Sequence, residues 1–144
     1  MPMHQSTKTI RTVWIFTTIA LVFFALAAHA DRAKFGDVKF SDNDNGDSPT
    51  TLFSTDTAEI FLRAELVDMV GGETLTATWI AENVDDTPPN YKIDSADVTA
   101  KESMTDANFS LRKPSTGWHV GDYRVDMAIN GNPAGIARFK IAKP

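Results

Sequence analysis

Apolar and polar side chains alternate with a period of two along most of the chain from residue 58 onward. Every second residue is apolar from Ile60 to Leu66, from Leu75 to Trp79 and from Tyr123 to Ile129. This alternation indicates strands with one buried face, because an amphipathic helix would repeat every 3.6 residues. We therefore expect an all-β fold after residue 30, with at most a single helical turn at Ser103–Asn108.

Turn residues divide this region into about seven short strands, at the ~8–12-residue spacing typical of a β-sandwich. Gly71-Gly72 predicts a hairpin turn, Pro88-Pro89 a loop, and Asn130-Gly131 a tight hairpin. Residues 31–52 are expected to be a polar segment with one edge strand near Val38. Residues 53–144 are expected to form the sandwich, and the chain after residue 30 has the length of one domain.

The first thirty residues have the layout of a secretory signal peptide. Lys8 and Arg11 precede a continuous apolar run, Val13–Ala28, and Ala28-His29-Ala30 fits a signal-peptidase site. We expect an N-terminal signal-peptide helix that is cleaved after Ala30. An uncleaved membrane anchor is the alternative, but the apolar run is shorter than the ~20 residues that span a bilayer.

The amino-acid composition limits the cellular compartments and the classes of partner that are expected for this chain. The chain contains no cysteine, so disulfides, a lipoprotein anchor, thiolate catalysis and cysteine metal sites are excluded. Small secreted eukaryotic domains usually depend on disulfides, which favours the bacterial periplasm or exterior. The net charge of −5 becomes more negative when Lys8 and Arg11 are removed. Nucleic acid and anionic membranes are therefore poor partners, and a soluble monomer is expected.

No residue pattern indicates an enzyme, a metal site or a cofactor site. His119 is the only histidine after the predicted cleavage site, and the chain lacks G-x-S-x-G, G-x-G-x-x-G and P-loop motifs. The acidic segment 41–49 does not fit the register of an EF-hand and is interpreted as a solvated loop. The methionines after the predicted cleavage site, Met69, Met104 and Met127, are too far apart in sequence to suggest a copper site.

The segment Gly121-Asp122-Tyr123-Arg124-Val125 resembles the tyrosine corner of immunoglobulin-type sandwiches. The resemblance implies that the Tyr123 hydroxyl bonds to backbone just upstream and that Trp79 is the core tryptophan. It also places Val125 where antibody domains have a cysteine.

More broadly, the chain is similar to bacterial exported immunoglobulin-like domains of the GW-x-x-G-x-Y-x-V type. The similarity spans most of residues 53–141 and implies the fold, but it supplies no functional site. The residues that carry it are Phe53, Asp56, Ile60, Leu62, Gly72, Leu75, Trp79, Gly117, Trp118, Gly121, Tyr123, Val125, Gly131, Phe139 and Ile141.

The function predicted from these features is a non-catalytic accessory or protein-interaction module of the bacterial envelope, with a partner that the sequence does not name. The alternative is a periplasmic domain that binds a sugar or a metal ion. Trp118 is the candidate for contact with a partner, because a loop tryptophan can stack on a sugar ring or a protein side chain. The competing interpretation is that its ring folds over the end of the sandwich.

Processing can be tested directly. Intact-mass measurement of the exported protein should give an N-terminus at Asp31, because cleavage is expected after Ala30. Recovery of the full-length chain from the membrane fraction would favour the uncleaved anchor.

Overall fold

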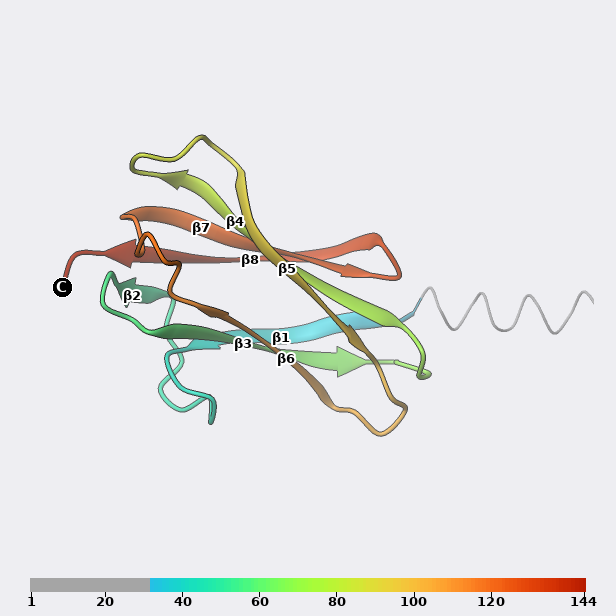
Figure 1. Ribbon diagram of the computed structural model, residues 1–144. Coiled ribbons are helices and arrows are strands. Elements are labelled where there is room, and N and C mark those ends of the chain that lie inside the picture. The colour runs from blue at the N-terminus through green and yellow to red at the C-terminus, as the bar shows by residue number, and fades with distance from the viewer. Residues whose placement is uncertain (1–31) are drawn as a thin grey trace, which may run out of the picture.

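The computed structural model describes residues 32–144, and the predicted signal peptide and its cleavage site lie outside the described residues. The described chain is all-β and forms two sheets (Figure 1). Within it, no helix is long and apolar enough to cross a membrane. The strands are β1 (Lys34–Ser41), β2 (Leu52–Ser54), β3 (Glu59–Val67), β4 (Thr74–Val84), β5 (Tyr91–Thr99), β6 (Asp106–Arg112), β7 (Gly121–Ile129) and β8 (Asn132–Ala142).

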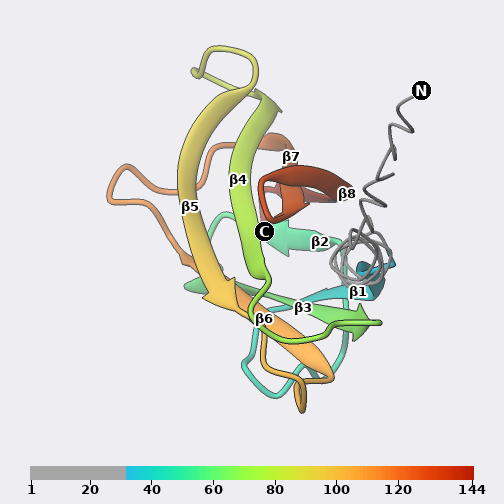
Figure 2. The ribbon, with the colours of Figure 1, turned by 90° about the vertical axis from the view of Figure 1, so that its right-hand side faces the viewer.

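The sheets have the strand orders β1-β3-β6 and β2-β8-β7-β4-β5, which we call the three-stranded and the five-stranded sheet. They lie face to face, and Figure 2 shows β1, β2 and β8 on the same side of the sandwich. Neighbouring strands are antiparallel except for β2, which runs parallel to β8. The chain therefore forms a two-layer sandwich, the arrangement that period-two alternation predicts.

The core lies between the sheets and is rich in aromatic side chains. Trp79 of β4 is 1% exposed and packs edge-on against Phe139 of β8, with ring centroids 6.0 Å apart. Phe40 of β1 reaches across from the other sheet, and its ring centroid lies 5.1 Å from that of Phe139. The inward rows predicted from the alternation are confirmed for β3, β4 and β7.

The predicted edge strand near Val38 exists as β1, at the edge of the three-stranded sheet. Its Phe40 belongs to the same core as the rest of the sandwich. The short strand β2 was not anticipated, because only three residues pair with β8 and they show no clear alternation. It raises the number of strands to eight.

The prediction of a hairpin at Gly71-Gly72 was wrong. Strands β3 and β4 belong to different sheets, so this connection crosses the sandwich. Both glycines adopt positive φ angles, +93° and +91°, which suits a change of direction as well as it suits a hairpin. The buried Glu73 holds the crossing, because its carboxylate accepts hydrogen bonds from the backbone N–H groups of Val70 and Gly71.

The single helical turn predicted at Ser103–Asn108 is also absent. A turn closes between Lys101 and Met104, and β6 begins at Asp106. Ala107 is fully buried against the core, and pairing with β3 extends to this end of β6. Packing of this segment in the sheet therefore overrides its local preference for a turn.

By contrast, the hairpin at Asn130-Gly131 is confirmed. Both residues have positive φ angles, +51° and +79°, as a tight two-residue turn between β7 and β8 requires.

Replacing Trp79 with alanine should lower the free energy of unfolding by about 3–5 kcal/mol, because the change leaves a large cavity in the core. Denaturant titration of the two proteins measures this difference. Trp79→Phe is the matched control, since the indole N–H has no hydrogen-bond partner within residues 32–144 and its removal leaves no acceptor unpaired. A near-neutral Trp79→Ala would contradict the core position of this side chain.

Candidate functional site

Trp118 lies in the loop between β6 and β7, where Gly117 has a φ of +83°. The indole N–H donates a 2.7 Å hydrogen bond to the carbonyl of Thr57, and the ring packs edge-on against Tyr123 at 5.8 Å. Only 6% of Trp118 is exposed. This geometry favours the interpretation that Trp118 closes the end of the sandwich and leaves little of its ring for a partner.

Tyr123 forms the corner that the sequence predicted. Its hydroxyl donates a 2.7 Å hydrogen bond to the carbonyl of His119, four residues upstream. The ring stacks on Phe139 with centroids 5.2 Å apart, and burial raises the pKa of Tyr123. Tyr123 and the backbone of His119 therefore serve to hold the loop against the core.

Gly121 and Val125 have structural positions on either side of Tyr123. A Cβ on Gly121 would overlap the carbonyl oxygen of Asn83 and would lie 2.6 Å from the Cα of Val84, so only glycine lets β7 approach β4 here. Val125 is fully buried opposite Trp79 on β4. The residues singled out from the sequence are thus brought together, but in the core and not at an exposed site.

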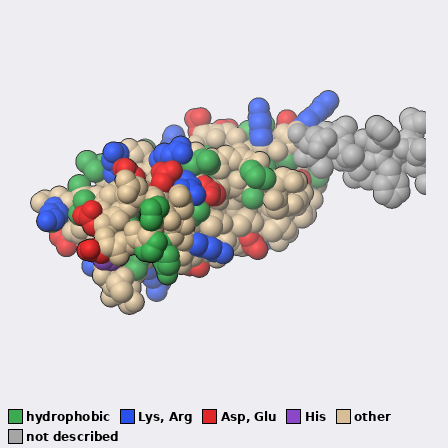
Figure 3. Space-filling model, turned by 90° about the horizontal axis from the view of Figure 1, so that it is seen from above, with side chains coloured by type: hydrophobic (Ala, Val, Ile, Leu, Met, Phe, Trp, Pro, Cys, Tyr) green, Lys and Arg blue, Asp and Glu red, His purple; other side chains and the backbone are tan. Residues whose placement is uncertain are grey.

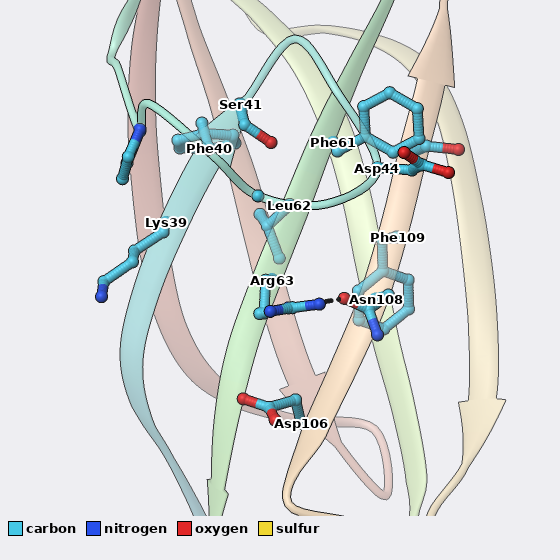
Figure 4. Close-up of a pocket in the computed structure, with 13 residues that line it drawn as sticks. Lys39, Phe40, Ser41, Asp44, Phe61, Leu62, Arg63, Asp106, Asn108 and Phe109 are labelled. Carbon is cyan, nitrogen blue, oxygen red and sulfur yellow. Dashed lines mark hydrogen bonds between the residues drawn. The ribbon is translucent and has the colours of Figure 1, made fainter.

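The sequence did not indicate a groove of about 600 Å³ on the outer face of the three-stranded sheet. We call it the outer groove. Arg63 on β3 donates a 3.2 Å hydrogen bond to the side chain of Asn108 on β6. Figure 4 shows these two side chains together on adjacent strands, with Asp106 below them and Asp44 above them on the β1–β2 loop.

The β1–β2 loop covers part of the outer groove. A Cβ on Gly46 would lie 3.8 Å from Arg63 Nη1, so the loop passes directly over the guanidinium. Phe61 of β3 adds an aromatic ring to a lining that mixes apolar residues with polar residues of both charges. Such a surface can bind planar polar groups by hydrogen bonds and an apolar face by contact with the ring.

The outer groove could not be predicted from the sequence, because its residues come from strands and a loop that are far apart in the chain. The one available signal was Phe61, a large apolar residue in an outward position of an alternating strand.

The outer face of the five-stranded sheet carries an ion-pair network centred on Arg124 of β7. Its Nε donates a 2.9 Å hydrogen bond to Asp126, and its Nη1 contacts Glu82 of β4 at 3.4 Å. Hydrogen bonding to Asp126 raises the pKa of Arg124. A second arginine, Arg138 of β8, pairs with Glu82 at 3.4 Å, so the network joins three neighbouring strands.

Charges of both signs are intermixed on this side of the molecule (Figure 3). The Arg124 network also reaches the β4–β5 loop, because Nη1 donates to the side chain of Asn90 at 2.5 Å. Asn90 has a φ of +59°, and its contact with Arg124 fixes the loop that was predicted from the two prolines. The network therefore links the outer face of the five-stranded sheet to the β4–β5 loop.

The acidic loop 41–49 is organised by Asn43. Its side-chain oxygen accepts a hydrogen bond from the N–H of Asp47, and its side-chain nitrogen donates to the Asp47 carbonyl, both at 3.0 Å. Within residues 32–144, no three histidine, aspartate or glutamate side chains are grouped so that they could hold a metal ion.

Comparison with known proteins shows the fold and no more. No protein-family model matches the chain, and no curated protein is significantly similar to it. A solved immunoglobulin-like protein from Pseudomonas aeruginosa is 15% identical and superposes with a TM-score of 0.52. The match covers 76% of this chain and 96% of the Pseudomonas chain.

Two larger proteins match only in part. An alkylpurine DNA glycosylase from Pseudomonas fluorescens and a β-glucosidase from Listeria innocua give TM-scores of 0.47 and 0.41 at 16% and 10% identity. Each match covers 76% of this chain, but only 30% of the glycosylase and 16% of the glucosidase. Similarities this distant carry no inference about activity. The fold of the described chain is immunoglobulin-like.

Removing the Trp118 side chain separates the two interpretations of this residue. If the ring closes the core, Trp118→Ala should lower the free energy of unfolding by about 3–5 kcal/mol, close to the loss for Trp79→Ala. Trp118→Phe keeps an aromatic ring but removes the hydrogen bond to the Thr57 carbonyl. It should lower the free energy of unfolding by about 1 kcal/mol. An unchanged denaturation midpoint for Trp118→Ala would instead identify a residue held for binding.

Proposed function

We propose that this chain is an exported, non-catalytic immunoglobulin-like module that binds a protein partner in the bacterial envelope. One observation carries the proposal. The motif residues Trp79, Trp118, Tyr123 and Val125 are all buried in one core, so the fold uses them for stability. The outer faces and edges of the sheets are what remains for binding.

Three further observations support this proposal. The apolar N-terminal run with its Ala28-His29-Ala30 site is typical of an exported protein. The fold similarity extends over 96% of an immunoglobulin-like chain from Pseudomonas aeruginosa, so a sandwich of this size accounts for nearly all of that chain. The outer faces carry exposed charges outside the Arg124 network, such as Arg112 and Lys140, whose ion pairs lie at the surface, which suits recognition by charge complementarity.

Sugar binding is the second candidate, and the outer groove supports it. Arg63, Asn108 and Asp106 present planar polar groups to the groove, and Phe61 supplies an aromatic ring beside them. Planar hydrogen-bonding groups match vicinal hydroxyls, while the ring matches the apolar face of a sugar. In this case the module would bind a glycan of the envelope.

A photo-crosslinking amino acid at exposed positions tests the first candidate. We place it at Ser110 on the outer face of the three-stranded sheet and at Asp97 on β5, both of which are exposed. A third position is Ile136 on β8, which is 54% exposed. Irradiation of cells that export these variants should give a protein adduct of one defined mass from at least one of the three positions.

The contrary result would be the absence of any protein adduct, together with a rise in melting temperature on addition of oligosaccharides. If Asn108→Ala removes that rise and Asp97→Ala does not, the outer groove is a sugar site and the protein-binding proposal fails.

A further inference from the structure

The edge of β8 is only partly covered. Strand β2 pairs with β8 at Lys140–Ala142 and nowhere else. Strand β1 lies on the same side but pairs only with β3 in the other sheet. The edge of β8 before Lys140 therefore has no partner strand within residues 32–144.

The backbone groups that point to this open edge follow from the register. The N–H of Lys140 donates to the carbonyl of Thr51, so it points toward β2 and away from β7. The pairing of β8 with β7 is continuous from Gly135 to Ile141, so the direction of the backbone groups alternates regularly there. The N–H and C=O groups of Arg138 and Ile136 consequently point to the same side as those of Lys140, where no strand receives them.

A groove of about 580 Å³ runs along this edge, between β1 and β8, and we call it the edge groove. One end is closed by the chain at Thr50-Thr51. The N–H of Thr50 donates to Phe40 of β1, and Thr51 accepts from Lys140 of β8. Beyond this bridge the edge groove continues in line with β2.

The lining of the edge groove has two different sides. Val38 and Ala137 face the interior, are only partly buried and pack against the core, so an apolar side chain placed here would complete their burial. Ile136 points to the outer face and is 54% exposed. A strand laid along β8 would therefore alternate between an apolar inner side and a solvated outer side.

Charge indicates which polar residues such a strand would carry between its apolar ones. The charged residues that line the edge groove are Lys39 and Arg138, both basic, in a chain whose net charge is −5. Lys39 takes part in none of the ion pairs of the described chain, and Arg138 is 62% exposed in its single contact with Glu82. Acidic side chains would be attracted to both positions.

We propose that the edge groove binds an extended segment of the partner protein, with alternating apolar and acidic residues, as an added strand on β8. The proposal rests on the protein-binding function proposed above and specifies its site and its ligand. Backbone hydrogen bonds to Ile136 and Arg138 give affinity, and the alternating side chains give register and specificity.

The other long free edge of the five-stranded sheet is less suited to this role. Strand β5 has a bulge opposite Trp79 and Ile80 and carries Lys92, Asp94 and Asp97 along its length. Bulges and mixed charges on an edge oppose the addition of a further strand.

The probe is a short synthetic peptide that alternates valine and glutamate, with a valine–lysine peptide of the same length as control. On titration into the purified protein, the glutamate peptide should slow amide hydrogen exchange at Ile136 and Arg138 and leave β5 unaffected. Lys39→Glu should weaken its binding by roughly fivefold, since an attraction becomes a repulsion. Lys92→Glu, a matched change on the exposed edge strand β5, should have no effect.

Ile136→Pro removes only an outward N–H at a sheet edge, so the peptide should no longer slow amide exchange at Arg138. Circular dichroism checks that the fold is retained. The proposal would be overturned if the lysine peptide slowed amide exchange at Ile136 and Arg138 as much as the glutamate peptide, or if neither peptide slowed it. Slow amide exchange at Ile136 and Arg138 in the absence of peptide would also overturn the proposal. If this slowing increased with protein concentration, a second copy of the chain would occupy the edge. If it did not, another segment of the same chain would occupy the edge.

A photo-crosslinker at Ile136 separates failure of this site from failure of the proposed function. Protein adducts from Ser110 or Asp97 and none from Ile136 would reject the edge groove and keep the protein-binding function. The absence of adducts from all of these positions would reject both.

Discussion

The contact between Phe40 and Phe139 joins the two sheets, and much of the molecule depends on it. Phe40 belongs to β1 and Phe139 to β8, and their ring centroids lie 5.1 Å apart. Phe139 in turn contacts Trp79, Tyr123 and Phe53, so one side chain links four aromatic neighbours from both sheets. In a chain without cysteine, no inter-sheet disulfide can supplement this cluster. A disulfide restricts the unfolded chain, whereas an aromatic cluster stabilises only the folded one.

The strand that carries Phe40 also forms one wall of the open edge. It pairs only with β3 in the three-stranded sheet, and the chain after it reaches β8 at Thr50-Thr51. The short β2 then covers the last three residues of β8, and the same edge of its remaining residues has no partner strand in the described part of the chain. The groove between β1 and β8 is thus a consequence of how the core is closed, and its apolar inner wall is an extension of that core.

The sequence predicts the interior of this protein much better than its surface. Burial imposes a period of two on Tyr123, Val125, Met127 and Ile129, and the Asn130-Gly131 turn has a local chemical signature, so both were predictable. The Gly71-Gly72 connection was misread because positive φ angles are needed equally by a hairpin and by a crossing between sheets. Only the tertiary pairing of β3 with β6, a contact between distant segments, decides between them.

The same reasoning explains why Trp118, which is conspicuous in the sequence, exposes little of its ring. An aromatic residue in a loop is conspicuous in a sequence, but the loop here bends inward, so the indole N–H bonds to Thr57 and the ring covers Tyr123. The features that can bind a partner have no local signature, because they arise where segments distant in sequence meet. Arg63 and Asn108 meet across β3 and β6, and Val38 and Ile136 line one groove from two different sheets. For an immunoglobulin-like domain, a search for function therefore begins with its sheet edges and outer faces, since the residues that define the fold are the ones that the core makes inaccessible.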